Sequence, residues 1–279
     1  MELFLILFGI YFCVVILLAT IVFFISQLIE NNGIMDVSYG PLFAIAAWST
    51  ILISGTYEIL PILLATIATM WGVRRGIRAV KKNDLLKESD WYTTLRTEWQ
   101  ANGRVYFILR SFIQLNLLRG IIIVFISLPI IIGVFGALNY SGLFLILGLL
   151  ISLVGLSIEA FADYQLDQFT KEKKENIEPA LIMTKGLFSY TRHPRYFGET
   201  LLWWGFAIAV LPLPLGYLGL ISPLLATYIL TRHTAPKIEN SMIETYGEPY
   251  ETYAARTSYF IPRFPKNISD SNDESSNYQ

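Results

Sequence analysis

The stretch LFLILFGIYFCVVILLATIVFFISQL, residues 3–28, contains no Asp, Glu, Lys or Arg. A helix that crosses a bilayer needs about 20 mainly apolar residues, so this stretch predicts a membrane span. The same character extends along the chain of 279 residues, of which 54% are hydrophobic and 15% charged. Soluble domains average about 25% charged residues. The mean hydropathy of +0.50 therefore predicts an all-α, polytopic transmembrane helical bundle.

Six more apolar segments follow the first one, which predicts about seven spans in total. The last two segments are short, and the sequence Leu-Pro-Leu-Pro-Leu-Gly at 211–216 joins them. Its two prolines interrupt the helix, so a tight hairpin is expected there. The predicted spans are 3–28, 36–54, 57–73, 112–136, 142–162, 199–214 and 216–231.

The positive charges predict how the chain crosses the membrane. Residues 1–73 contain no Lys or Arg, and all but one of the 21 positive charges fall in the blocks 74–110, 163–199 and 232–279. Cytoplasmic loops carry the excess of Lys and Arg, so these three blocks share the cytoplasmic side. The N-terminus is then outside and the C-terminus cytoplasmic, in a bacterial inner membrane or the endoplasmic reticulum.

The composition also predicts domains and partners. We expect one transmembrane enzyme domain over 1–265, with a cofactor-binding half at about 140–265, and a disordered polar tail at 266–279. A net charge of −1 gives no attraction to nucleic acid, so membrane lipid and a hydrophobic small molecule are the expected partners. The single cysteine, Cys13, belongs to no metal-binding cluster, and no metal site is predicted.

The segment 186–204 is the richest in functional groups. Arg192 and His193 precede the start of a membrane-entering helix, where free backbone N–H groups also point outward. Together they would form an anion site at the membrane surface. The alternative is an interfacial anchor, with Trp203 and Trp204 in the aromatic belt.

Acidic residues and histidines mark the same cytoplasmic side. Glu159, Asp163 and Asp167 recur every four residues and share one helix face, which faces either a polar cavity or solvent. Both histidines, His193 and His233, stand in Thr-Arg-His triplets that flank the final hairpin. One anionic ligand could therefore meet two Arg–His pairs.

Two further features involve the predicted spans and the C-terminal region. Asp36 and Tyr39 lie three residues apart, so they could face the bundle interior as a general-acid pair, although Tyr39 could instead sit at the headgroup level. Arg119 interrupts an apolar run and needs a carboxylate, a carbonyl or a ligand as its partner. Tyr246 and Tyr250 recur at helical spacing, which by itself indicates an amphipathic interfacial helix.

Several motifs resemble a known family. They are Asp163-Tyr-Gln with Phe169, Gly186-Leu-Phe-Ser-Tyr-Thr-Arg-His-Pro-Arg-Tyr-Phe-Gly-Glu, Tyr246-Gly with Tyr250, Tyr253, Thr257 and Phe260-Ile-Pro, Arg110-Ser-Phe-Ile-Gln, and Asp36-Val-Ser-Tyr-Gly. Over residues 30–265 the chain resembles the uncharacterised membrane family that is grouped with the steroid 5-alpha-reductase C-terminal domain. The wider superfamily includes sterol reductases, isoprenylcysteine carboxyl methyltransferases and phospholipid methyltransferases.

The resemblance implies a cytoplasmic pocket for a nucleotide-type cofactor. Glu199 directly after Gly198, and Gln165 two residues after Asp163, resemble the reductases. Arg195 departs from them, because reductases usually place Asn there, but an arginine suits the 2′-phosphate of NADPH. The predicted cofactor-binding residues are Asp163, Gln165, Lys171, Arg192, His193, Arg195, Tyr196, Glu199, His233, Tyr246 and Tyr250.

The expected function is NADPH-dependent reduction of a C=C bond in a lipid-soluble substrate, with Asp36 and Tyr39 as the catalytic proton-donating pair. The first alternative is a membrane methyltransferase that uses S-adenosylmethionine, whose sulfonium would need acids and aromatic rings such as Glu199, Glu239 and the tyrosines. The second is a non-catalytic lipid-binding membrane protein.

The predicted topology can be tested with reporters at the two ends of the chain. We expect a reporter after Gln279 to be cytoplasmic and a tag before Met1 to be exposed outside, because Lys and Arg are confined to alternate loops. Protease accessibility in sealed vesicles of each orientation measures this. An N-terminal tag cleaved only from the cytoplasmic face would contradict it.

Overall fold

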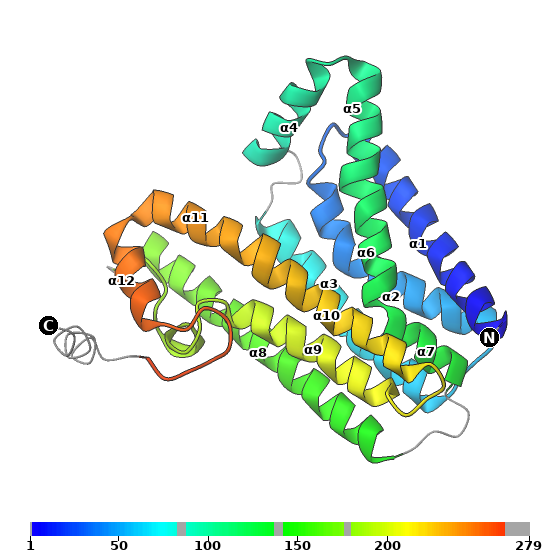
Figure 1. Cartoon of the computed structure of the whole chain (residues 1–279). Helices are drawn as coiled ribbons and strands as arrows, with labels where there is room; N and C mark the ends of the chain where they lie inside the picture. Colours follow the sequence, from blue (N-terminus) through cyan, green and yellow to red (C-terminus); the bar gives the residue numbers. More distant parts are fainter. Residues whose placement is uncertain (1, 83–87, 137–141, 176–179, 266–279) are drawn as a thin grey trace, which may run out of the picture. The chain divides into compact units, whose positions relative to one another are not determined.

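A computed structural model describes residues 2–82, 88–136, 142–175 and 180–265. These residues are almost entirely helical and contain no strand (Figure 1). The predicted disordered tail, 266–279, lies outside the described residues. The chain divides into two compact units. Unit 1 comprises Met1–Leu149 and Phe206–Ser222, and unit 2 comprises Leu150–Gly205 and Pro223–Gln279.

The first half of the chain forms α1 to α7. Their bounds are α1 Glu2–Leu28, α2 Ile34–Ser54, α3 Ile59–Lys82, α4 Asp90–Gln100, α5 Arg104–Ser111, a π-helix Phe112–Leu117, α6 Leu118–Ile126 and α7 Leu128–Gly136. The second half forms α8 Leu143–Lys174, a 3₁₀ turn Gly186–Ser189, α9 Pro194–Val210, a 3₁₀ turn Gly216–Leu220, α10 Ile221–Ile229, a π-helix Leu230–Thr234, α11 Ala235–Tyr246 and α12 Glu248–Arg256.

Four helical segments of the described chain are long and apolar enough to cross a membrane. They are Glu2–Leu28, Ile34–Ser54, Arg104–Ile126 and Leu143–Lys174. The predicted all-α fold is confirmed, whereas the predicted spans 57–73, 199–214 and 216–231 are not among these four. Helix α9 has 17 residues, which is less than the length of about 20 that a straight span needs.

The predicted span 112–136 is not one continuous helix, because α6 ends at Ile126 and α7 begins at Leu128. Pro129 lies in the first turn of α7, where its missing N–H leaves no gap in the hydrogen bonding. Its ring would clash with the carbonyl four residues earlier in a continuous helix. The same chemistry ends α9 at Val210, before the two prolines of 211–216, so the predicted turn there is confirmed.

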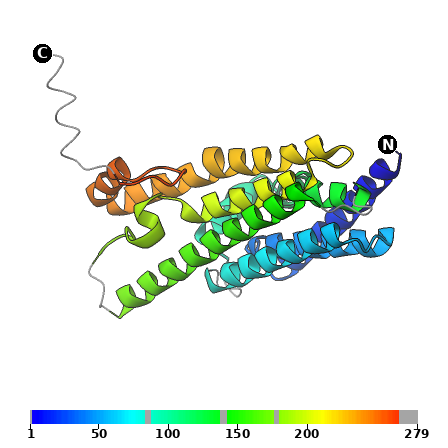
Figure 2. The ribbon, with the colours of Figure 1, turned by 90° about the horizontal axis from the view of Figure 1, so that it is seen from below.

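Glycines hold the central helix pair of unit 1 together. Helices α2 and α3 run side by side (Figures 1 and 2), and the backbone of Gly40 lies directly against that of Gly72. Trp48 Nε1 donates a hydrogen bond to Thr69 Oγ1 at 2.9 Å between the same two helices. Small residues allow such close approach, which favours helix association within a membrane.

Unit 2 uses the same device between α8 and α9. Gly155 and Gly198 face each other, and a Cβ at either position would overlap backbone atoms of the other helix. Ser152 Oγ donates to the Leu202 carbonyl at 3.1 Å. This tight contact determines where the first two turns of α9, which carry Arg195 and Glu199, lie relative to α8.

Substituting Gly40 or Gly72 with alanine should destabilise the protein, because the new methyl group overlaps the backbone of the partner helix. Overpacking of this kind costs about 1–3 kcal/mol. Thermal unfolding of the purified protein in detergent measures the loss. The control is Gly9→Ala in α1, where a Cβ would meet nothing within 4 Å. Equal stability of all three variants would rule out the close contact.

Candidate functional site

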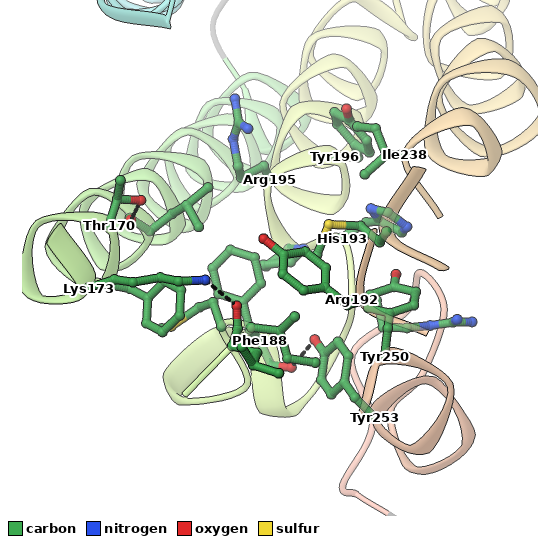
Figure 3. A pocket seen from close by; sticks show the side chains of 18 residues that line it. Thr170, Lys173, Phe188, Arg192, His193, Arg195, Tyr196, Ile238, Tyr250 and Tyr253 are labelled. Carbon is green, nitrogen blue, oxygen red and sulfur yellow. Dashed lines mark hydrogen bonds between the residues drawn. The ribbon is translucent and has the colours of Figure 1, made fainter. Parts of the chain in front are cut away.

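Unit 2 contains a cavity of about 360 Å³ between the C-terminal end of α8, the start of α9, and helices α11 and α12 (Figure 3). Its wall is mainly aromatic and apolar, and three cationic side chains reach it. The aromatic residues that line it are Phe169, Phe188, Tyr196, Tyr246, Tyr250 and Tyr253. The predicted site residues that line it are Arg192, His193, Arg195, Tyr196, Tyr246 and Tyr250.

A shared carboxylate organises the centre of this site. Arg192 Nη1 lies 2.5 Å from Glu239 Oε2, and His193 Nε2 lies 2.8 Å from Glu239 Oε1. The hydroxyl of Tyr250 also donates to Glu239 Oε1, at 2.9 Å. One acid of α11 thus holds the loop before α9 and the first turns of α12 in a single network.

Burial shapes the protonation of this network. Burial by itself raises the pKa of Glu239. The hydrogen bond with His193 and the positive charge of Arg192 together lower it by more, so the pKa lies below the ordinary value of 4.5. Burial and the negative charge of Glu239 raise the pKa of Tyr250. Glu239 is therefore ionised at neutral pH. The phenol of Tyr250 stays protonated and can donate its hydrogen bond to Glu239.

The segment after α12 closes this network from the other side. Arg192 N donates to the Ser258 carbonyl at 2.9 Å, and Thr191 Oγ1 donates to the Phe260 carbonyl at 2.9 Å. The Tyr259 ring lies under the Arg192 guanidinium, with 5.2 Å between Cζ and the ring centre. The position of Arg192 therefore depends on contacts with residues more than 45 positions further along the chain.

Other predicted residues support the cavity without lining it. Asp163 forms an ion pair with Arg195, at 2.5 Å between Oδ1 and Nε. Gln165 accepts a hydrogen bond from Leu187 N at 3.0 Å, beside the left-handed turn at Gly186. Glu199 is buried but is not part of the cavity wall.

Two predicted residues lie elsewhere. Lys171 and His233 are exposed and do not line the cavity, and the His233 ring packs against Tyr228. The expectation that one ligand meets both Arg–His pairs therefore has no support in unit 2. His193 is buried against Glu239, whereas His233 faces outward from a π-helical turn.

Lys173 also lines the cavity, although no sequence motif singled it out. It reaches in from α8, opposite Tyr250 and Tyr253 (Figure 3). Its ammonium donates to the Leu181 carbonyl at 2.7 Å and lies 5.3 Å from the Tyr246 ring centre. Helical spacing could have identified it, because Leu166, Phe169, Thr170 and Lys173 share one face of α8.

The donors present fit the anionic part of a nucleotide-type cofactor. Arg192 Nε is buried and makes no hydrogen bond to another described residue, although Nη1 is held by Glu239. A buried guanidinium N–H without an acceptor is costly, and a ligand oxygen would satisfy it. Lys173 supplies a second positive charge, and the aromatic wall offers stacking surfaces.

Unit 1 holds a separate polar network at the start of α2. Arg119 Nη1 donates to Asp36 Oδ1 at 2.9 Å, and Arg119 Nη2 donates to Tyr92 Oη at 2.9 Å. The hydroxyl of Tyr92 donates to Asp36 Oδ1 at 3.0 Å. Burial raises the pKa of Tyr92 by more than the charge of Arg119 lowers it, so its phenol stays protonated. This network supplies the partner that Arg119 required.

The tyrosine that forms a hydrogen bond with Asp36 is thus Tyr92 of α4. Tyr39, the predicted partner of Asp36, packs edge-on against Phe43 and Trp71, and Arg75 lies over its ring at 5.4 Å. No sequence signal pointed to Tyr92, which lies 56 residues from Asp36.

These features define an all-helical protein with four segments able to span a membrane and a charged, aromatic cavity in one unit. Residues 22–257 match the family described as "Protein of unknown function (DUF1295)", and the chain belongs to that family. No curated protein and no solved structure matches the chain. The predicted membership of an uncharacterised family is confirmed, and its link to the steroid 5-alpha-reductases stays a prediction.

Replacing Glu239 with glutamine should destabilise the protein by about 3 kcal/mol, the lower end of the range for breaking a fully buried ion pair, because the pair with Arg192 is only partly buried. Because the folded pKa of Glu239 is depressed, its contribution is present above pH 4.5 and is lost as the pH falls through the folded pKa. The gap between wild type and Glu239→Gln should therefore shrink below pH 4.5.

Thermal unfolding in detergent, at neutral pH and at a series of pH values that extends well below 4.5, measures both effects. Glu244→Gln, an exposed substitution on the same helix, is the matched control and should change stability little. A Glu239→Gln variant as stable as this control at pH 7 would show that the shared carboxylate contributes nothing.

Proposed function

We propose that the protein is an integral membrane oxidoreductase. It uses NADPH to reduce a C=C bond in a lipid-soluble substrate, steroid-like or another isoprenoid or lipid. The observation that carries the proposal is the aromatic cavity of unit 2, into which Lys173 and Arg192 bring positive charge. An anionic dinucleotide with flat rings suits both the charges and the aromatic surfaces.

Within this proposal, Lys173 and Arg192 hold phosphate oxygens, and Tyr196, Tyr246 and Tyr250 offer rings for stacking. NADPH supplies a hydride when it is bound, and the protein supplies orientation and a proton. The candidate proton source is the polar network around Asp36. Tyr39 was predicted as the partner of Asp36, but Tyr92 is the tyrosine that donates a hydrogen bond to it. Saturating the double bond requires one hydride at one carbon and one proton at the other.

The proposed topology is the seven-span arrangement of the sequence analysis, with the N-terminus outside and the C-terminus cytoplasmic. It would place the cavity of unit 2 beside the cytoplasm, because its basic residues belong to the blocks 163–199 and 232–279. The four long apolar segments support membrane insertion. A bacterial inner membrane or the endoplasmic reticulum would provide both the lipid substrate and cytosolic NADPH.

A second candidate is a methyltransferase that uses S-adenosylmethionine. The observation that favours it is that Arg192 and Arg195 are each paired with a carboxylate, Glu239 and Asp163. The acid of Glu239 and the surrounding aromatic rings would suit a sulfonium, since a cation is attracted to the faces of such rings. The third reading, a non-catalytic lipid-binding protein, needs no cofactor at all.

Thermal stabilisation by the cofactor separates these functions. A ligand that binds only the folded state stabilises it by about 2.7 kcal/mol at a hundredfold excess over Kd. We therefore expect NADPH to raise the Tm of the purified protein in detergent, and S-adenosylmethionine to leave it unchanged. Arg192→Ala should weaken NADPH binding by about 1.5–3 kcal/mol, as for the loss of a charge-assisted hydrogen bond.

The matched control is Arg232→Ala, in the second Thr-Arg-His triplet, because Arg232 is exposed and does not line the cavity. NADPH affinity that is equal in the two variants would remove Arg192 from the site. Stabilisation by S-adenosylmethionine alone would establish the methyltransferase. If a sterol stabilises the protein and neither cofactor does, the lipid-binding reading replaces both enzymes.

A further inference from the structure

A second pocket of unit 2 adjoins the cavity described above, which is here called the first pocket. It has a volume of about 430 Å³ and lies between the 180–189 loop and α12. Leu181, Ile182 and Tyr253 line both pockets, so they form the boundary between the two spaces. The hydroxyl of Tyr253 donates to the Phe188 carbonyl at 2.6 Å, which holds the ring of this boundary in place.

The chemistry of the second pocket differs from that of the first. Apart from the Tyr253 ring at the boundary, its described wall carries the hydroxyl groups of threonine and serine where the first pocket has aromatic rings. The hydroxyls of Thr184, Thr252 and Thr257 make no hydrogen bond to any other described residue. Ser189 also lines the pocket, but its hydroxyl donates to the Gly186 carbonyl at 2.7 Å. Three hydroxyl donors are therefore available to a ligand.

One cation completes this set. Arg256, in the last turn of α12, lines the second pocket, and its guanidinium has no ion pair or hydrogen bond with another described residue. Arg192 and Arg195 of the first pocket, in contrast, are each paired with a carboxylate. The described residues that line the second pocket include no Asp or Glu, so none of these residues neutralises Arg256.

We propose that the second pocket is an anion site for a phosphoryl group, held by Arg256 together with the hydroxyls of Thr252, Thr257 and Thr184. A guanidinium beside hydroxyl donors is suited to phosphate oxygens, which accept several hydrogen bonds at once. Because the two pockets share a boundary, the phosphoryl group belongs to the ligand whose rings occupy the first pocket. This assignment rests on the proposed nucleotide cofactor, and a lipid headgroup is the other source of the same chemistry.

Inorganic pyrophosphate tests the anion site without any cofactor. Its affinity is measured by titration of the full-length protein in detergent, for wild type, Arg256→Gln and Thr252→Val. Arg256→Gln should weaken pyrophosphate binding about tenfold or more, as expected when a charged hydrogen-bond donor is lost. Thr252→Val keeps the side-chain shape and should weaken binding by a smaller factor.

The matched control is Arg232→Gln, which removes an exposed arginine of the same unit outside both pockets. Arg256 is itself exposed, so its substitution should leave the fold intact, and the Tm of each variant without ligand verifies this. Equal pyrophosphate affinity in Arg256→Gln and Arg232→Gln would overturn the anion site.

Two further titrations identify the source of the phosphoryl group. If the group belongs to the cofactor, Arg256→Gln also weakens NADPH binding, and NADPH competes with pyrophosphate. If it belongs to a lipid, pyrophosphate binds wild type more weakly in nanodiscs of phosphatidylglycerol than in nanodiscs of phosphatidylcholine. This difference between the two lipids is absent in Arg256→Gln. Either result supports the anion site.

The two proposals fail in different ways. A selective loss of pyrophosphate binding in Arg256→Gln, with no binding of NADPH or S-adenosylmethionine to wild type, supports the anion site and rejects the proposed cofactor. Binding of NADPH to wild type, with unchanged NADPH and pyrophosphate affinities in Arg256→Gln, rejects the anion site and leaves the reductase in place.

Discussion

The carboxylate of Glu239 is the interaction on which the cavity of unit 2 depends. It binds Arg192, His193 and Tyr250, and so connects the loop before α9 with α11 and α12. A half-buried carboxylate is costly unless its oxygens are paired, and here both oxygens accept hydrogen bonds. These partners keep the acid ionised and hold the cationic and aromatic walls of the cavity at fixed positions.

In unit 1, an arginine in place of an acid is the charged group that must be paired. Arg119 interrupts an apolar segment, where an unpaired charge would be strongly unfavourable. Its guanidinium reaches Asp36 at the start of α2 and the hydroxyl of Tyr92 on α4. Tyr92 is itself held by a small apolar cluster with Trp99, Phe107 and Leu115. The arginine thereby connects segments 83 residues apart in the sequence.

The balance of charge in unit 2 bears directly on what it binds. Two of the three cations at the first cavity are neutralised by acids, which leaves Lys173 as the cation of that wall without an ion pair among the described residues. The second pocket, in contrast, has one cation and no acid among the described residues that line it. A ligand with an aromatic part and a separate anionic part matches this division. Its anionic part would lie beside Arg256, whose positive charge no acid of the described wall neutralises.

Hydropathy, charge and proline positions along the chain predicted the all-α class, the helices over 3–28 and 36–54, the turn at 211–216 and the place of Arg192 and His193 just before a helix. These features depend on a residue and its near neighbours, which is why a sequence shows them. Only the tertiary structure decided that Tyr92 is the tyrosine bonded to Asp36, that Lys173 and not Lys171 lines the cavity, and that Glu239 joins Arg192 to His193. Such pairings depend on the depth and rotation of packed helices, and those follow from close contacts such as Gly155 against Gly198, which no local pattern specifies.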